Sequence, residues 1–134
     1  MKKVLSLFIL LAVLSVSFSC IDTSKAEVKL ITAEEMQSIL EQEDVQVIDV
    51  RSAEEYDEVH IVNAQNIDIN SPTFDEDIIG LDKERPIILY CKGGGRSAKC
   101  AKKMQDAGFE KIYDLEGGIS RWEHSDKIDL EVKS

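Results

Sequence analysis

The sequence predicts one α/β domain of three layers, in which a mainly parallel central sheet carries helices on both faces. Short apolar runs at residues 45–50 (VQVIDV) and 86–90 (PIILY) have the composition of buried strands. Stretches with helical periodicity separate such runs, and parallel strands need crossover connections of this kind. The length of 134 residues suits a single domain.

The first helix of this domain is predicted over residues 33–42. Thr32 is followed three residues later by Glu35, which is the spacing of a capping box, and Met36 begins an apolar stripe at helical spacing. In chain order, the other expected elements are strand 45–50, helix 53–59, strand 64–69, strand 86–90, helix 97–107 ending at Gly108, strand 111–115, a short helix over 119–122 and an edge strand over 128–132.

The segment best suited to catalysis or ligand binding is Cys91-Lys92-Gly93-Gly94-Gly95-Arg96-Ser97, which directly follows the apolar strand and begins a helix. In parallel sheets, ligands gather at the carboxyl ends of strands, where Cys91 is expected. Glycines leave a tight turn unobstructed, so the amides from Lys92 to Ser97 can curl inward as an anion-binding nest. The start of the helix adds a positive dipole end.

A sulfur atom in such a nest is more stable as a thiolate than as a thiol. Arg96 adds positive charge, and Lys92 is a further source of it. Thiols in these settings have pKa values of roughly 3.5 to 7.5. We therefore predict that Cys91 is a nucleophile at neutral pH and needs no neighbouring histidine as a base.

Four segments in this order resemble the rhodanese family, over roughly residues 30–128. They are Asp49-Val50-Arg51 with Glu55-Tyr56, His60-Ile61 through Ala64 and Asn66-Ile67, the loop from Cys91 to Ser97, and Leu115-Glu116-Gly117-Gly118-Ile119 with Trp122. The resemblance implies a rhodanese-like fold and a sulfurtransferase. Cys91 would take sulfur as a persulfide from a small anionic donor such as thiosulfate, and a thiol acceptor would remove it.

The same resemblance assigns roles around Cys91. The backbone amides of Lys92, Gly93, Gly94, Gly95, Arg96 and Ser97 would hold the persulfide, the Arg96 side chain would orient the oxyanion of the donor, and the Lys92 side chain is a further contact. The chain departs from the family at Val59 and Asn63, where glycine is usual before the His60-Ile61 pair and before Ala64.

Five other residues receive structural interpretations. Asp49 and Arg51 are expected to form a structural ion pair. His60 is expected to be a structural histidine within its turn, neither a base nor a metal ligand. Cys100 is expected to be a small core residue, with a resolving thiol for Cys91 as the alternative, and Trp122 to cover the core. We expect no metal site and no cofactor.

Two other functions stay open. A phosphatase or arsenate reductase of related fold would use the same Cys and Arg, but four residues separate Cys91 from Arg96 here, whereas the related phosphatases have five. A non-catalytic rhodanese-like module that binds a partner is the second alternative, because some family members lack the nucleophile.

The N-terminus predicts export. Lys2 and Lys3 precede an apolar stretch over residues 4–18, which is too short for a bilayer span and typical of a signal peptide over residues 1–19. Ser19 before Cys20 resembles a bacterial lipobox, so we expect a lipidated Cys20, a polar tether over residues 20–29 and a folded domain over residues 30–134. Ordinary cleavage, with Ser17 and Ser19 flanking Phe18, is the alternative.

The net charge and the number of cysteines limit which classes of partner and which cellular location we expect. Loss of Lys2 and Lys3 would take the net charge from −10 to −12, which disfavours nucleic acid as a partner. Three cysteines in all do not make a disulfide scaffold. We expect a protein of the bacterial cell envelope, anchored to the membrane through its N-terminal lipid and facing the periplasm or the exterior, with no specified protein partner.

Overall fold

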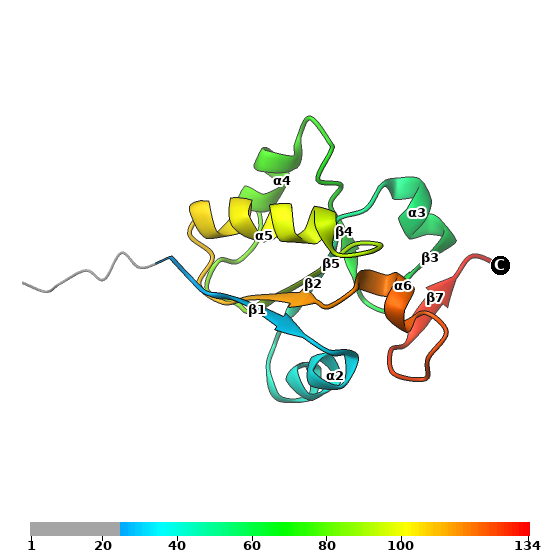
Figure 1. The fold of residues 1–134 in the computed structure, drawn as a ribbon. Helices are drawn as coiled ribbons and strands as arrows, with labels where there is room; N and C mark the ends of the chain where they lie inside the picture. Colours follow the sequence, from blue (N-terminus) through cyan, green and yellow to red (C-terminus); the bar gives the residue numbers. More distant parts are fainter. Residues whose placement is uncertain (1–24) are drawn as a thin grey trace, which may run out of the picture.

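The computed structural model describes residues 25–134, which form the predicted three-layer α/β domain (Figure 1). The central sheet has the strand order β1-β6-β5-β2-β4, and all of its strands pair in parallel. Its strands are β1 (Val28–Ile31), β2 (Gln46–Asp49), β4 (Gln65–Asn66), β5 (Ile87–Tyr90) and β6 (Ile112–Leu115). A separate antiparallel pair joins β3 (Val59–Ile61) to β7 (Leu130–Val132).

Helices cover both faces of the sheet, α4 and α5 on one side and α2 on the other (Figure 1). The helices are α2 (Ala33–Gln42), α3 (Ala53–Glu58), α4 (Phe74–Ile79), α5 (Gly95–Asp106) and α6 (Gly118–Trp122). The predicted capping box of α2 is present, because Thr32 and Glu35 each accept a hydrogen bond from the other's backbone amide. Ser52 and Glu55 build a second capping box at the start of α3.

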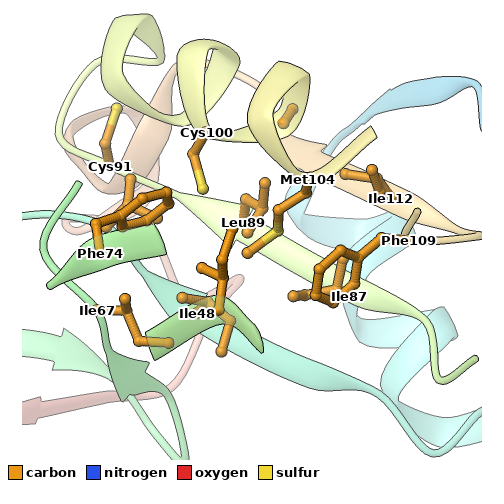
Figure 2. Close-up of a cluster of buried hydrophobic side chains, with 13 residues drawn as sticks. Ile48, Ile67, Phe74, Ile87, Leu89, Cys91, Cys100, Met104, Phe109 and Ile112 are labelled. Atoms are coloured by element: carbon orange, nitrogen blue, oxygen red, sulfur yellow. The ribbon is translucent and has the colours of Figure 1, made fainter. Parts of the chain in front are cut away.

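Two apolar clusters fill the spaces between the layers. The alternation of strand side chains sends Leu89 and Ile112 toward α4 and α5, and it sends Tyr90 and Leu115 toward α2 and α6. Figure 2 shows the first cluster, with Met104 of α5 among its members. β5 is buried along its whole length, which explains why its sequence is apolar throughout.

Several element boundaries differ from those expected. β1 begins at Val28, inside the segment expected to be a tether up to Lys29, because its backbone pairs with β6 despite exposed side chains. The strand expected over 64–69 is only Gln65–Asn66. Helix α5 begins at Gly95, two residues before Ser97, and the strand over 128–132 begins at Leu130 and pairs with β3.

The predicted end of α5 at Gly108 is confirmed in detail. Gly108 has φ +92°, a left-handed conformation that favours glycine. Its amide donates to the carbonyl of Gln105, and the amide of Phe109 donates to the carbonyl of Met104. These two bonds form a Schellman motif, which turns the chain toward β6.

The signal peptide over residues 1–19 and the lipidation of Cys20 lie outside the described residues. Between residues 25 and 134, no helix has both the length and the apolar character that a bilayer crossing requires.

Candidate active site

Cys91 follows the last residue of β5, at the carboxyl edge of the parallel sheet where it was expected. The strand is central in the sheet, so its end is flanked by those of β6 and β2. Only 1% of the Cys91 surface is exposed. The chain then turns through Lys92 and Gly93 and enters α5, which places the thiol beside the start of that helix.

The Cys91 sulfur forms hydrogen bonds within its own loop. The amide of Gly94 donates to Sγ at 3.0 Å, and the thiol donates to Ser97 Oγ at 3.6 Å. Burial raises the pKa of Cys91, but hydrogen bonds from the Ser97 side chain and from the amides of Ser97, Gly94 and Gly93 outweigh burial, so the pKa is lowered overall. The loop therefore favours the thiolate.

The three glycines of the loop differ in whether the backbone conformation requires glycine. Gly94 has φ +109°, which other residues rarely adopt. Gly93 and Gly95 have no positive φ, and a Cβ at either position would meet nothing within 4 Å. Backbone conformation thus requires glycine only at Gly94, and a side chain would fit at the other two positions.

The turn before α6, which contains Gly117 and Gly118, supports the Cys91 loop through hydrogen bonds. The amides of Ile119 and Ser120, in the first turn of α6, donate to the carbonyls of Cys91 at 2.9 Å and Lys92 at 3.1 Å. Gly118 allows this approach, because a Cβ there would lie 2.3 Å from the Lys92 carbonyl oxygen. The turn between β6 and α6 therefore fixes the backbone under the thiol.

Arg96 is already bound to an acidic partner that the sequence reasoning did not assign to the site. Its two terminal nitrogens donate to Glu55 of α3 at 2.6 and 2.8 Å. This ion pair lowers the pKa of Glu55 to about 2, so Glu55 is a carboxylate at neutral pH. Spacing along the chain gave no sign of this contact, which joins residues 41 positions apart.

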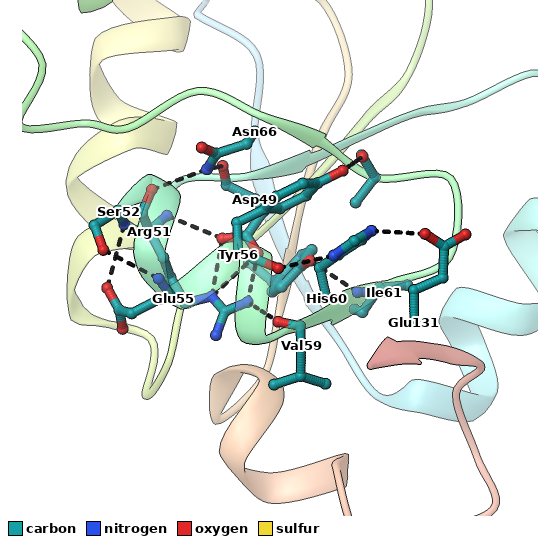
Figure 3. Close-up of polar contacts among 12 residues, drawn as sticks. Asp49, Arg51, Ser52, Glu55, Tyr56, Val59, His60, Ile61, Asn66 and Glu131 are labelled. Carbon is teal, nitrogen blue, oxygen red and sulfur yellow. Dashed lines mark hydrogen bonds and ion pairs between the residues drawn. The ribbon is translucent and has the colours of Figure 1, made fainter. Parts of the chain in front are cut away.

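The ion pair of Asp49 and Arg51 is buried and structural, as expected (Figure 3). Arg51 donates to both carboxylate oxygens of Asp49, and also to the carbonyl of Val59 at 2.6 Å. Asn66 adds hydrogen bonds to the carbonyls of Asp49 and Arg51. These contacts tie β2 to the start of β3.

His60 also makes structural contacts. Its ring stacks on Tyr56 at 3.8 Å, and its nitrogens contact the Tyr56 carbonyl and Glu131 of β7. The two departures from the family pattern are accommodated nearby. Val59 is extended, with φ −159°, and Asn63 takes φ +63°, which asparagine tolerates better than most residues. The turn therefore forms without the usual glycines.

The remaining predicted residues lie in three different settings. Lys92 is exposed and lines a hollow of about 160 Å³ with Glu55 and Ser120. Cys100 points from α5 into the core (Figure 2), and burial raises its pKa to about 12, as suits the expected core residue rather than a reactive thiol. Trp122 is half-buried against the second cluster. Residues 25–134 contain no group of three side chains able to hold a metal ion.

Comparison with known proteins supports the resemblance seen in the sequence. A sequence model of the rhodanese-like domain matches residues 32–125. Thiosulfate sulfurtransferase GlpE of Coxiella burnetii is 32% identical over 94 residues, which are 70% of this chain and 86% of the relative. A tRNA uridine(34) hydroxylase of Yersinia pestis is 36% identical over 93 residues, but these span 65% of this chain and only 26% of that enzyme.

Solved structures agree with the fold. A rhodanese-like domain protein from Staphylococcus aureus superposes with a TM-score of 0.66 and 33% identity, covering 79% of this chain and 99% of that one. A rhodanese-related protein from Thermoplasma volcanium superposes with a TM-score of 0.67 and 26% identity over the same shares.

Proposed function

Because the chain belongs to the rhodanese-like domain family, we propose that it is a sulfurtransferase that carries sulfane sulfur as a persulfide on Cys91. The observation that carries this proposal is the amide of Gly94, 3.0 Å from the Cys91 sulfur, in a loop that lowers the pKa of the thiol. A preorganised amide stabilises an anionic sulfur without reorganisation during the reaction. The likeness to a thiosulfate sulfurtransferase over most of that protein's length supports the same reaction.

The proposed reaction has two displacement steps. In the first, the Cys91 thiolate attacks the outer sulfur of thiosulfate, the sulfur–sulfur bond of the donor breaks, and sulfite leaves with the bonding electron pair. Cys91 then carries a persulfide. In the second, the thiolate of an acceptor attacks the outer sulfur, takes it as its own persulfide and returns Cys91 to the thiolate.

Arg96 and Lys92 are proposed to attract the donor. A guanidinium has five N–H donors. Two of those of Arg96 contact Glu55, which leaves the other three for the oxygens of thiosulfate. Lys92 is exposed beside the loop and adds a mobile positive charge.

The test is the mass of the protein after incubation with thiosulfate. We expect the purified protein to gain the mass of one sulfur atom, and cyanide to remove it. Cys91→Ser should gain none, whereas Cys100→Ser, a matched control in the buried core, should gain as much as the wild type. Absence of an adduct with thiosulfate and with an organic persulfide would refute the proposal and favour a binding module.

A phosphatase or arsenate reductase would be revealed by the same pair of variants. Turnover of an aryl phosphate or of arsenate that disappears in Cys91→Ser would replace sulfur transfer by that chemistry. The proposed reaction predicts no such turnover, because the four-residue spacing from Cys91 to Arg96 leaves a smaller cradle than the related phosphatases have.

We propose further that the protein is exported and held at the membrane by a lipid on Cys20. This rests on the sequence of residues 1–20 alone. Expression in a bacterium should place the wild type in the membrane fraction, and Cys20→Ser should release it into the soluble fraction. A wild type that is soluble, with a free N-terminus at Cys20 or later, would instead indicate ordinary cleavage.

A further inference from the structure

Asp114 of β6 is a buried carboxyl group that forms no ion pair among residues 25–134. Strand alternation places it on the same sheet face as Ile112 and Leu89, beneath α5. Only 3% of its surface is exposed, and its Oδ1 has no hydrogen-bond partner among residues 25–134. Native proteins seldom leave such an atom unsatisfied without a reason.

Asp49, equally buried on β2, shows what a charged carboxylate needs in this sheet. Arg51 donates to both of its oxygens. Within the described part of the chain no cation pairs with Asp114, and the thiols of Cys91 and Cys100 lie on the same side of the sheet. Lys103 of α5 acts on Cys100, but it is not among the groups that shift the pKa of Asp114. Burial raises the pKa of Asp114, and Ser97 lowers it by less.

Ser97 connects this carboxyl group to the candidate nucleophile. Its side chain is fully buried in the first turn of α5, on the face that packs against β6. Its hydroxyl donates to the carbonyl of Gly94 at 3.1 Å and lies 3.6 Å from the Cys91 sulfur. A hydroxyl has a single hydrogen, so Ser97 can donate to the Gly94 carbonyl or to a Cys91 thiolate, but not to both at once.

We propose that Asp114 is a positioning residue for Cys91: in its neutral form it donates its O–H to Ser97 Oγ, so that the Ser97 hydrogen can turn from the Gly94 carbonyl to the sulfur when Cys91 is a thiolate. An ionised Asp114 would draw that hydrogen toward itself and add a second negative charge next to the sulfur. This inference rests on the proposed function, because it concerns the stability of the Cys91 thiolate.

The test compares Asp114→Asn with Asp114→Leu by the pH dependence of Cys91 alkylation. Reaction with iodoacetamide is followed by mass spectrometry of the peptide that contains Cys91, so Cys20 and Cys100 do not contribute. Asparagine keeps a neutral N–H donor of the same size, and we expect it to leave the pH midpoint unchanged. Leucine removes the donor and should raise the midpoint by about one unit, a tenfold loss of thiolate at a given pH.

Two further measurements keep the inference open to refutation if Asp114→Leu does not fold. Ser97→Ala should raise the midpoint, because it removes the hydroxyl that connects Asp114 to Cys91. The carboxyl carbon of Asp114 should have the chemical shift of a neutral acid at neutral pH in the wild type. A midpoint that falls in Asp114→Asn, or a carboxylate shift at neutral pH, would overturn the inference.

Failure of this inference differs from failure of sulfur transfer. Alkylation reports the Cys91 thiolate whether or not a persulfide forms. A normal sulfur adduct with an unperturbed pH profile in Asp114→Leu would reject the role of Asp114 alone.

Discussion

Replacing Gly118 by alanine should loosen the loop that carries Cys91. The added Cβ would lie 2.3 Å from the Lys92 carbonyl oxygen and 2.6 Å from that of Cys91, in a residue with φ +62°. Real Cβ atoms essentially never approach within 3.0 Å, and both contacts are with backbone, so the turn itself must move by about 0.7 Å, the difference between 3.0 and 2.3 Å.

The magnitude follows from the contacts that this movement disturbs. A left-handed conformation costs a residue with a side chain roughly 1 to 2 kcal/mol. The hydrogen bonds from Ile119 and Ser120 to the loop carbonyls each contribute roughly 0.5 to 1.5 kcal/mol. Together these give a loss of about 2 to 5 kcal/mol in the free energy of unfolding for Gly118→Ala.

Gly117→Ala is the matched control, because its φ of +74° is also left-handed but its Cβ would meet only the side chain of Arg121. That side chain can move, so the loss should stay near 1 to 2 kcal/mol. Urea unfolding measures both values, and the rate of Cys91 alkylation reports the loop. Equal destabilisation by the two variants, with Cys91 reactivity unchanged in Gly118→Ala, would refute the role given to Gly118.

Three other predictions concern charge. Because the pKa of Cys91 is lowered in the folded protein, the unfolded chain keeps the thiol proton up to a higher pH. The free energy of unfolding of the wild type should therefore increase, relative to that of Cys91→Ser, as the pH rises toward the ordinary pKa of 9.0. Urea unfolding at several pH values measures this difference. Arg51→Met leaves the Asp49 charge buried and should cost about 3 kcal/mol in the same assay, whereas a loss below about 1 kcal/mol would contradict a buried ion pair. The Glu55 pKa of about 2, against 4.5 ordinarily, contributes stability at neutral pH that is lost as pH falls from about 4.5 toward 2. Glu55→Gln should remove this part of the acid dependence, and an unchanged acid titration would argue against the Arg96 contact.

Much of the fold could be predicted because its signals are local. The capping box at Thr32, the apolar run of β5 and the glycine at the end of α5 each depend on residues a few positions apart. β1 and β3 were not predicted, because the contacts that define them are not local. Each is a strand because a distant segment, β6 or β7, supplies its hydrogen bonds, while its own side chains are partly exposed.

The sequence by itself determined the position of the thiol, between a buried strand and the start of a helix. An apolar strand, a cysteine, a glycine run and a helix start are consecutive, and backbone sterics and the helix dipole act over that same short range. Whether this thiol transfers sulfur stays a prediction.

Only the tertiary structure decided which groups surround that loop. Glu55 reaches Arg96, Gly118 supports the backbone of Cys91 and Lys92, and Asp114 is buried on the sheet face that α5 covers. These partners come from α3, α6 and β6, which are distant in the chain and are brought together by sheet order and helix packing. Charge and burial act through space, so their effect on the candidate nucleophile depends on neighbours that sequence spacing does not reveal.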